Sequence, residues 1–305
     1  MVTRALWAFA LVSLAAGCKP NFGTPSSLVV DERILAVRGT PAEVRPQDSA
    51  MFDALVVSPG GTEAMPALDW ALCVVPKPLD ENNVVASACQ LDSGVMGVGN
   101  GATATATIPA DTCALFGPDP PPQLPGQPLL RPRDPDVTGG YYQPLRLTEG
   151  SVMGFMLERV TCDLANAGAD IAVQYGMTYT ANTNPTLQPL AATVDGAAVA
   201  LDALPAGKTV DFSVAWPAES VESFPVYDAN SGKLVTHRES MRVSWFVTAG
   251  EFTHDITGRD ENDPATSTDN EWTVPTTPGP VHLWVVLRDS RGGVDYAAYE
   301  LTVTP

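Results

Sequence analysis

The chain has 305 residues, enough for two ordinary domains, and its 35 acidic and 17 basic side chains give a net charge of −18. A chain this acidic repels nucleic acid and anionic membrane surfaces, which attract basic patches, so we expect no nucleic-acid partner. Its five cysteines form neither a CxxC pair nor a Cys/His cluster of zinc spacing, so we expect no bound zinc and no other cofactor.

The first residues are typical of an export signal. Arg4 precedes an apolar stretch at residues 5–16, which is shorter than the roughly 20 apolar residues of a membrane-spanning helix. The sequence LAAGC at residues 14–18 resembles the lipobox of bacterial lipoproteins. The resemblance implies cleavage of a signal peptide at residues 1–17 and lipidation of Cys18, followed by a tether at residues 18–27. An ordinary signal peptide with an incidental Cys18 is the alternative.

Short β-rich runs follow the tether. They occupy residues 28–39, 49–57, 67–75, 102–109, 141–149 and 151–162, and clusters of turn-forming residues separate them. Residues 117–136 hold eight prolines in twenty positions, which predicts a long extended loop within one domain. At residues 171–182, Ile171, Val173, Tyr175, Met177 and Tyr179 alternate with other residues, and this period predicts a further strand.

The segment NTNPTLQP at residues 182–189 indicates a domain boundary, which gives modules at 28–184 and 188–305. The second module continues with strand-like runs, such as the one that places Val210, Phe212, Val214 and Trp216 on one face. The runs recur at the spacing of a β-sandwich. No segment shows long helical periodicity, so the predicted fold class is all-β, with two sandwiches in tandem.

Particular residues of the second module resemble PKD and other Ig-like domains of bacterial surface proteins. They are WFV at 245–247, AGEF at 249–252 and the closing residues 288–303, although the PKD signature WDFGDG is not present. The whole layout resembles surface lipoproteins of myxobacterial type, on ERILAVRGTPAEVRPQD, GGYYQPLR and TNPTLQPL. These resemblances imply an address in the cell envelope and two Ig-like modules. They imply no activity.

Four cysteines remain if Cys18 carries lipid. An exported chain meets an oxidising compartment where disulfides persist, and four cysteines allow three pairings. We favour Cys73–Cys89, which has a hairpin-like separation, and Cys113–Cys162, which would pin both ends of the proline-rich region.

Candidate catalytic residues are few. The sequence has no GxSxG, HExxH or Walker motif, and its three histidines lie far apart along the chain. Tyr141 and Tyr142 are adjacent, so in a strand one of them would face away from the core and could stack on a sugar or a peptide; ordinary strand packing is the alternative. We expect core packing for the tryptophans in alternating strands: Trp70, Trp216, Trp245 and Trp284.

The acidic loop at residues 258–272 is the richest polar cluster. Asp260, Asp263 and Asp269 are candidate ligands for calcium, which prefers carboxylate oxygens. Pro264 interrupts the loop, and the order Asp-x-Asp-x-Asp-Gly of a calcium cage is not present. We therefore expect a solvated loop with weak divalent binding and no specific metal site.

These observations favour a non-enzymatic, lipid-anchored module that binds, adheres to or spaces something at the cell envelope. The expected partners are the membrane, through the N-terminal lipid, and an envelope protein or glycan. Lys19 stands where an aspartate would resemble the inner-membrane retention signal, which favours the outer membrane. The alternatives are an envelope hydrolase built from scattered carboxylates and an accessory subunit of an envelope complex, which would expose an apolar patch.

Overall fold

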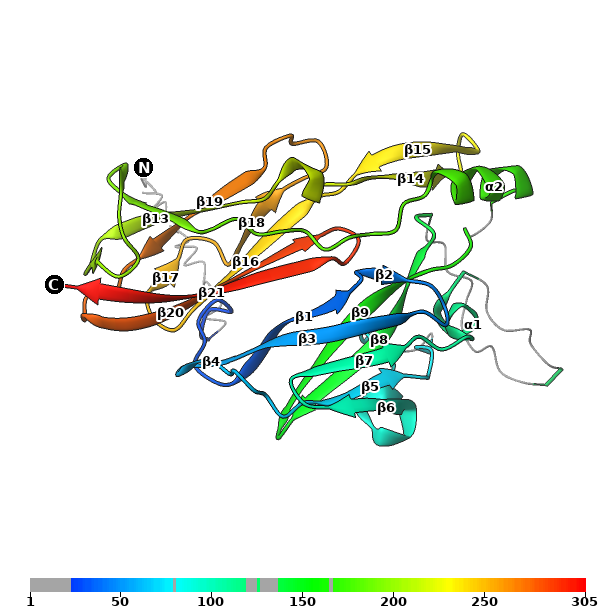
Figure 1. Cartoon of the computed structure of the whole chain (residues 1–305), viewed down its shortest axis with the longest axis horizontal. Coiled ribbons are helices and arrows are strands. Elements are labelled where there is room, and N and C mark those ends of the chain that lie inside the picture. The colour runs from blue at the N-terminus through cyan, green and yellow to red at the C-terminus, as the bar shows by residue number, and fades with distance from the viewer. Residues whose placement is uncertain (1–22, 79–80, 119–124, 127–136, 165–166) are drawn as a thin grey trace, which may run out of the picture.

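A computed structural model describes residues 23–78, 81–118, 125–126, 137–164 and 167–305 (Figure 1). These residues form 21 strands, two short α-helices and three 3-10 helices. The strands belong to four larger sheets and one separate hairpin. The predicted all-β class is therefore confirmed. Cys18 and most of the proline-rich segment lie outside the described residues.

Two sheets built from the first half of the chain make up what we call the first module. One sheet has the strands β1 (Arg33–Thr40), β3 (Ser49–Ser58), β4 (Gly61–Thr62) and β7 (Thr103–Thr107). The other runs in the order β2 (Glu43–Val44), β9 (Val152–Thr161), β8 (Gly140–Glu149), β5 (Asp69–Cys73) and β6 (Val95–Asn100).

The core of the first module comes from the alternation of its strands. In β3, Ala50 and Phe52 point inward while Ser49 and Met51 are exposed. Phe52 reaches across to Trp70 of β5, with ring centroids 6.4 Å apart. Pairing is antiparallel except between β2 and β9, which run parallel. Apolar residues of both sheets thus enclose one core.

Two further sheets and a hairpin make up the second module. The first sheet has β11 (Ala197–Ala198), β10 (Ala191–Val194), β13 (Thr209–Ala215), β19 (Ser267–Thr273) and β17 (Glu251–Phe252). The second has β12 (Leu204–Pro205), β21 (Val294–Thr304), β20 (Gly279–Asp289), β16 (Met241–Val247) and β18 (Ile256–Arg259). The strands β14 (Ser223–Asp228) and β15 (Lys233–Arg238) form the hairpin.

The core of the second module is aromatic. Trp216, Trp245 and Trp272 are at most 1% exposed, and Phe212 packs between the two sheets beside Trp272, with ring centroids 5.7 Å apart. Trp284 is equally buried, but it faces the other way from β20, toward the first module. The four tryptophans predicted to be core residues are all buried, in three different cores.

Helix α2 (Ala169–Thr178) corrects the sequence analysis, which predicted a strand at this position. Tyr175 in the last turn of the helix and Tyr179 at its C-cap lie four residues apart, and their rings stack with centroids 4.7 Å apart. In a strand the same residues would be about 13 Å apart. The alternation of apolar residues there coincides with an aromatic pair whose stacking requires the helical spacing.

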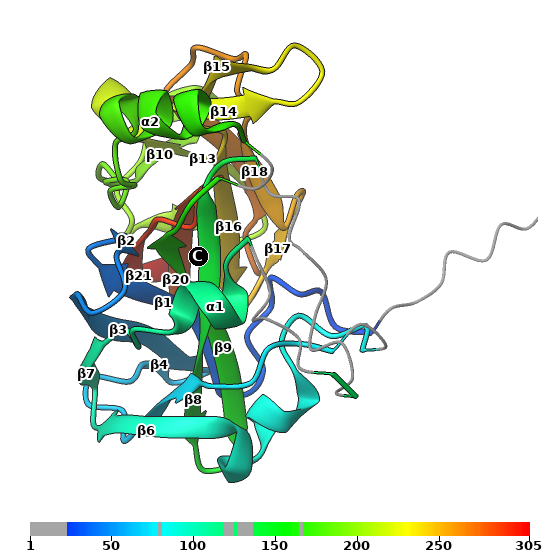
Figure 2. The ribbon, with the colours of Figure 1, turned by 90° about the vertical axis from the view of Figure 1, so that its right-hand side faces the viewer.

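The remaining helices are short. They are α1 (Thr112–Phe116) and 3-10 turns at Ser87–Gln90, Asp92–Gly94 and Ala218–Ser220. Helix α2 follows the first module in sequence but lies beside the β14–β15 hairpin of the second, at one end of the molecule (Figures 1 and 2). The C-terminus lies at the opposite end (Figure 1).

The two modules share an apolar core of their own. Leu35 of β1 and Leu55 of β3 pack against Trp284 and Val286, which point outward from β20. The indole N–H of Trp284 donates a hydrogen bond to the Thr62 hydroxyl at 2.8 Å. Burying such side chains contributes about 1.5–3 kcal/mol each. The contact between the modules is therefore a packed interface.

Candidate functional site

A cavity lies under helix α2. It has a volume of about 580 Å³ and adjoins a second cavity of about 420 Å³, with which it shares Arg45, Thr161 and Tyr179. We call these two spaces together the α2 cleft. Volumes of this order suit a small ligand or a few side chains of a partner. Because β2, β9 and α2 all contribute, the cleft depends on the fold of the whole first module.

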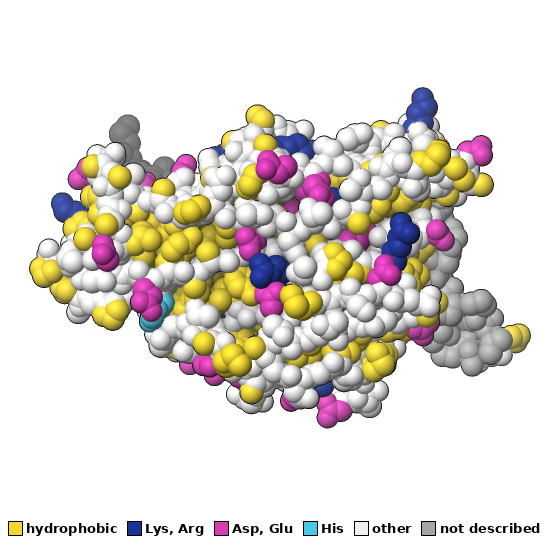
Figure 3. Space-filling view, in the orientation of Figure 1, with side chains coloured by type: hydrophobic (Ala, Val, Ile, Leu, Met, Phe, Trp, Pro, Cys, Tyr) yellow, Lys and Arg dark blue, Asp and Glu magenta, His cyan; other side chains and the backbone are white. Residues whose placement is uncertain are grey.

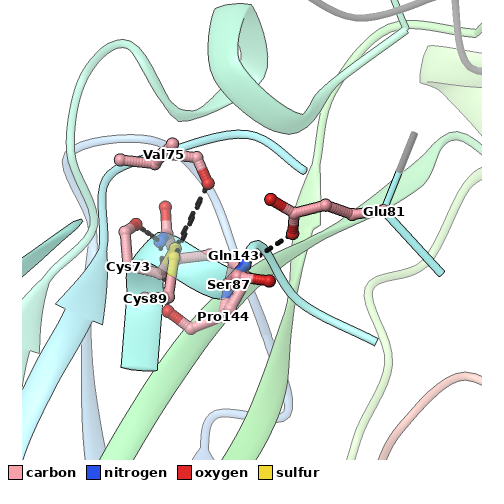
Figure 4. The surroundings of a disulfide bond; sticks show 7 residues. All are labelled: Cys73, Val75, Glu81, Ser87, Cys89, Gln143 and Pro144. Atoms are coloured by element: carbon pink, nitrogen blue, oxygen red, sulfur yellow. Dashed lines mark hydrogen bonds between the residues drawn. A yellow bond between two sulfur atoms is a disulfide. The ribbon is translucent and has the colours of Figure 1, made fainter. Parts of the chain in front are cut away.

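The wall of the α2 cleft includes the Cys113–Cys162 disulfide, which joins α1 to the segment after β9. A second disulfide, Cys73–Cys89, ties the end of β5 to a 3-10 turn (Figure 4). Both expected pairs are thus present. Beside the second disulfide, the buried amide of Gln143 donates to the carbonyl of Cys73 at 2.5 Å (Figure 4).

Glu43 forms the floor of the smaller cavity and is held by four donors. Its carboxylate accepts hydrogen bonds from the hydroxyls of Thr161 at 2.7 Å and Tyr179 at 2.6 Å. The backbone N–H of Asn182 donates to it at 2.9 Å and Nε of Arg159 at 3.2 Å. These four donors fix the position of the Glu43 carboxylate.

Burial and neighbouring charges determine the protonation of the arginine and the tyrosines around Glu43. Burial alone lowers the pKa of Arg159, but the nearby Tyr179, Tyr142 and Glu43 raise it overall, so the guanidinium stays charged. Burial raises the pKa of Tyr175, and the proximity of Tyr179 and Glu43 raises it further. Burial raises the pKa of Tyr179 as well. Tyr175 and Tyr179 therefore remain neutral hydrogen-bond donors near neutral pH, and they hold the polar groups around Glu43 in place.

Glu158, the neighbour of Arg159 on β9, is a buried acid of a different kind. Burial, followed by the charge of Glu43, raises its pKa to about 9. Its side-chain oxygens have no hydrogen-bond partner among the described residues, and the residue is 0% exposed. A protonated acid beside an ionised carboxylate is the arrangement of many glycosidase sites. Here the acid faces Gly39 in the interior, and it lines none of the four described cavities.

A second buried arginine, Arg291, lies next to Glu43 at the junction of the modules. Arg291, in the turn between β20 and β21, donates from Nε to Glu239 at 2.7 Å and from Nη2 to Glu222. Its Nη1 donates to the carbonyl of Thr180 at 3.0 Å and lies 3.9 Å from Glu43. We call Glu43, Arg159, Glu222, Glu239 and Arg291 the junction network.

Burial raises the pKa of Glu239 to about 7, and Asp289 raises it as well, against the opposing effect of Arg291. The network spans both modules, because Glu43 and Arg159 come from the first and the other three residues from the second. The linker between the modules joins it too: the backbone N–H of Asn182 donates to Glu43 at 2.9 Å, and its side-chain amide donates to Asp289 at 3.3 Å. The predicted boundary at 182–189 is thus a hydrogen-bonded segment.

The adjacent tyrosines of β8 differ in exposure, because Tyr141 is buried and Tyr142 is half-buried. Tyr141 is 1% exposed. The guanidinium of Arg159 lies over the ring of Tyr142, with Cζ 5.8 Å from the ring centroid. At both positions β8 pairs with β9 alone, because its pairing with β5 is confined to residues 145–148. Strand packing therefore describes Tyr141, whereas the half-buried Tyr142 packs one face of its ring against Arg159.

The carboxylates of the acidic loop bind their own backbone. Asp260 accepts hydrogen bonds from the N–H groups of Asn262 and Asp263, at 2.8 Å and 3.1 Å. Asp263 forms an ion pair with Arg259 at 3.2 Å, and Asp269 is exposed on β19, apart from that turn. Within the described ranges, no group of three or more His, Cys, Asp or Glu side chains is arranged to hold a metal ion.

Sequence reasoning did not find the junction network. Glu43 and Arg291 are brought together from opposite ends of the chain, and neither lies in a recognisable motif. The spacing of Tyr175 and Tyr179 was the one available signal. Among the helices that the structure describes, none is long and apolar enough to cross a membrane.

No protein-family model matches the chain, and no curated protein matches its sequence. Among solved structures, the chain is similar to the Yersinia pseudotuberculosis adhesin InvE, at 11% identity and a TM-score of 0.24, over 88% of this chain and 58% of that one. It is similar to Escherichia coli alpha-2-macroglobulin activated by porcine elastase, at 10% identity and a TM-score of 0.22, over 93% of this chain and 23% of that one.

The C-terminal domain of the Streptococcus pyogenes antigen I/II-family protein AspA is a third neighbour, at 11% identity and a TM-score of 0.23, over 92% of this chain and all of that one. The chain spans less than two thirds of the first two proteins. TM-scores this low do not establish a common fold, so these similarities carry no argument about function.

Proposed function

We propose that this protein is a lipid-anchored component of the cell envelope that acts as a rigid, non-enzymatic binding or spacer module, built from two Ig-like sandwiches. The junction between the modules is the observation that carries the proposal. An apolar core that includes Trp284 and a buried ion network around Arg291 both span it. A body that does not flex holds a binding surface in place, which reduces the entropic cost of ordering that surface on binding.

The α2 cleft supports binding in preference to chemistry. The carboxylate of Glu43 already accepts hydrogen bonds from four donors, and Tyr175 stays protonated near neutral pH because its pKa is raised. Arg45 on its rim is exposed and has no described ion pair, which leaves a cation available to an acidic partner group. Elsewhere, acidic side chains are spread over the visible face without gathering into one patch (Figure 3).

One experiment with two readouts tests the proposal. The full chain and its Cys18→Ser variant are expressed in a Gram-negative host with labelled palmitate. Lipidation predicts label and membrane sedimentation for the natural chain and neither for the variant. Equal labelling of both would contradict the anchor. Binding is then measured on the purified chain with fluorescent peptidoglycan fragments and with an acidic polysaccharide.

Charge reversal at the cleft identifies the binding surface. We expect Arg45→Glu to weaken capture of an acidic glycan by at least tenfold, because a charge-assisted contact becomes a repulsion. Lys208→Glu is the matched control, since Lys208 is also exposed but lies outside the cleft. Equal loss in both variants would show nonspecific attraction. Release of shortened glycan by the natural chain would favour the hydrolase alternative.

A further inference from the structure

A third cavity, of about 360 Å³, lies where the modules meet. Its walls are residues 34–37 of β1 and residues 154–157 of β9 from the first module, and Arg288, Gly292 and Val294 from the second. Most of these side chains are apolar, and Arg288 is the one charged residue that lines it. The cavity is separate from the α2 cleft, because the two share no lining residue.

Arg288 differs from the other partly buried arginines in its partners. Five arginines of the described chain form ion pairs with carboxylates: Arg38, Arg146, Arg159, Arg259 and Arg291. The described contacts of Arg288 include one hydrogen bond, from Nη2 to the carbonyl of Leu35 at 2.8 Å, and no carboxylate. A guanidinium carries five N–H donors, so most of its capacity is unused.

A second cation stands directly opposite Arg288. The register of β16 and β20 pairs Arg242 with Arg288 across the sheet, and like charges in that position are destabilising. Burial lowers the pKa of Arg288, and the charge of Arg242 lowers it further. Among the described residues, neither arginine forms an ion pair with a carboxylate. Arg242 is exposed and does not line the cavity itself, but it lies across the sheet from Arg288, which does. An anion that enters from outside would therefore meet both cations.

We propose that this cavity binds a small organic anion, with its carboxylate on Arg288 and Arg242 and its apolar body between Ile34 and Phe155. The volume lies at the lower end of the range for small-molecule sites, which limits the ligand to a short chain or a single ring. A phosphate ester with the same apolar body presents the same chemistry, because a guanidinium binds both groups in a bidentate manner.

Isothermal titration of the purified chain tests the proposal with octanoate, octyl phosphate and the uncharged octanol. We expect octanoate to bind with a Kd below about 1 mM, and octanol to bind at least tenfold more weakly. Tighter binding of octyl phosphate than of octanoate would identify phosphate esters as the natural class. Equal binding of octanol, or no heat from either anion at 10 mM, would overturn the proposal.

Two variants locate the site. Arg288→Met keeps the aliphatic stem but removes the charge, and it should weaken octanoate binding by tenfold or more. Its melting temperature without ligand should equal or exceed that of the natural chain, because the repulsion with Arg242 disappears. Arg259→Met removes an arginine of the same module that is already paired with Asp263, and it should leave octanoate binding unchanged. Unchanged binding by Arg288→Met would refute the assignment. This test does not depend on the anchor or on the α2 cleft.

Discussion

Replacing Arg291 by methionine should destabilise the protein strongly, because it leaves buried acids without a counter-charge. The side chain of Arg291 is 2% exposed and that of its partner Glu239 is 0% exposed. Removal of one member of a buried ion pair costs about 3–5 kcal/mol in the free energy of unfolding. Methionine keeps most of the packing volume, so the loss reports mainly on charge and hydrogen bonds.

The cost should depend on pH in a defined direction. The pKa of Glu239 is raised to about 7 with Arg291 present, and removal of the cation raises it further. Near pH 5 the acid is protonated in either protein, so the uncompensated charge disappears. Between pH 7 and pH 8 the natural protein ionises Glu239 while the variant does not, and one pH unit corresponds to about 1.4 kcal/mol. We therefore expect the cost to be about 1–2 kcal/mol smaller at pH 5 than at pH 8.

Urea unfolding followed by tryptophan fluorescence measures this cost at both pH values. The double variant Arg291→Met/Glu239→Gln should recover most of the stability, because it leaves no unpaired charge at this position. Arg259→Met is the control: its ion pair with Asp263 is about one third exposed and should contribute less than about 1 kcal/mol. A cost below about 1 kcal/mol for Arg291→Met at pH 8, or an equal cost at pH 5, would refute the reasoning about the junction network.

Two further predictions concern the first module. Glu158→Gln should stabilise the protein at pH 7 by up to about 3 kcal/mol. The raised pKa of this acid makes the natural protein lose stability as the pH rises from about 4.5 to 9, and glutamine removes that loss. Thermal melts over this pH range measure the effect, and an equal dependence of melting temperature on pH in both proteins would contradict it. Replacing the disulfide Cys113–Cys162, with its sequence separation of 49, by alanines should cost about 4 kcal/mol, and replacing Cys73–Cys89, with a separation of 16, about 3 kcal/mol. Chemical denaturation of the two double variants tests that order.

The strands were predictable from the sequence because their alternation is a local property. In β13, for example, Val210, Phe212 and Val214 face the core and Thr209 and Asp211 face solvent, as the period of two requires. The cysteine pairing followed from chain order and from the expected export. The local sequence pattern is therefore sufficient to predict a strand where one face of that strand is exposed to solvent.

Alternation also marks an apolar outward face, but it does not say what covers that face. Trp284 and Val286 alternate with inward residues of β20, and the element that buries them comes from the first module. The partners in the junction network are set by the same docking of modules, so no spacing in the sequence reveals Glu43 beside Arg291. Helix α2 was missed because an apolar period of two and an aromatic pair at spacing four occupy the same residues.

The first described residues of the chain have a mechanical consequence. Leu28 forms a parallel bridge with Val247, the last residue of β16, and the N–H of Val247 donates to the carbonyl of Ser27 at 2.8 Å. The N–H of Val29 donates in turn to the carbonyl of Val247 at 2.9 Å. A pull on the chain before Gly23 therefore reaches the second module before it reaches β1. Tension applied at the N-terminal side is therefore carried first by strand β16 of the second module, before it reaches the first module.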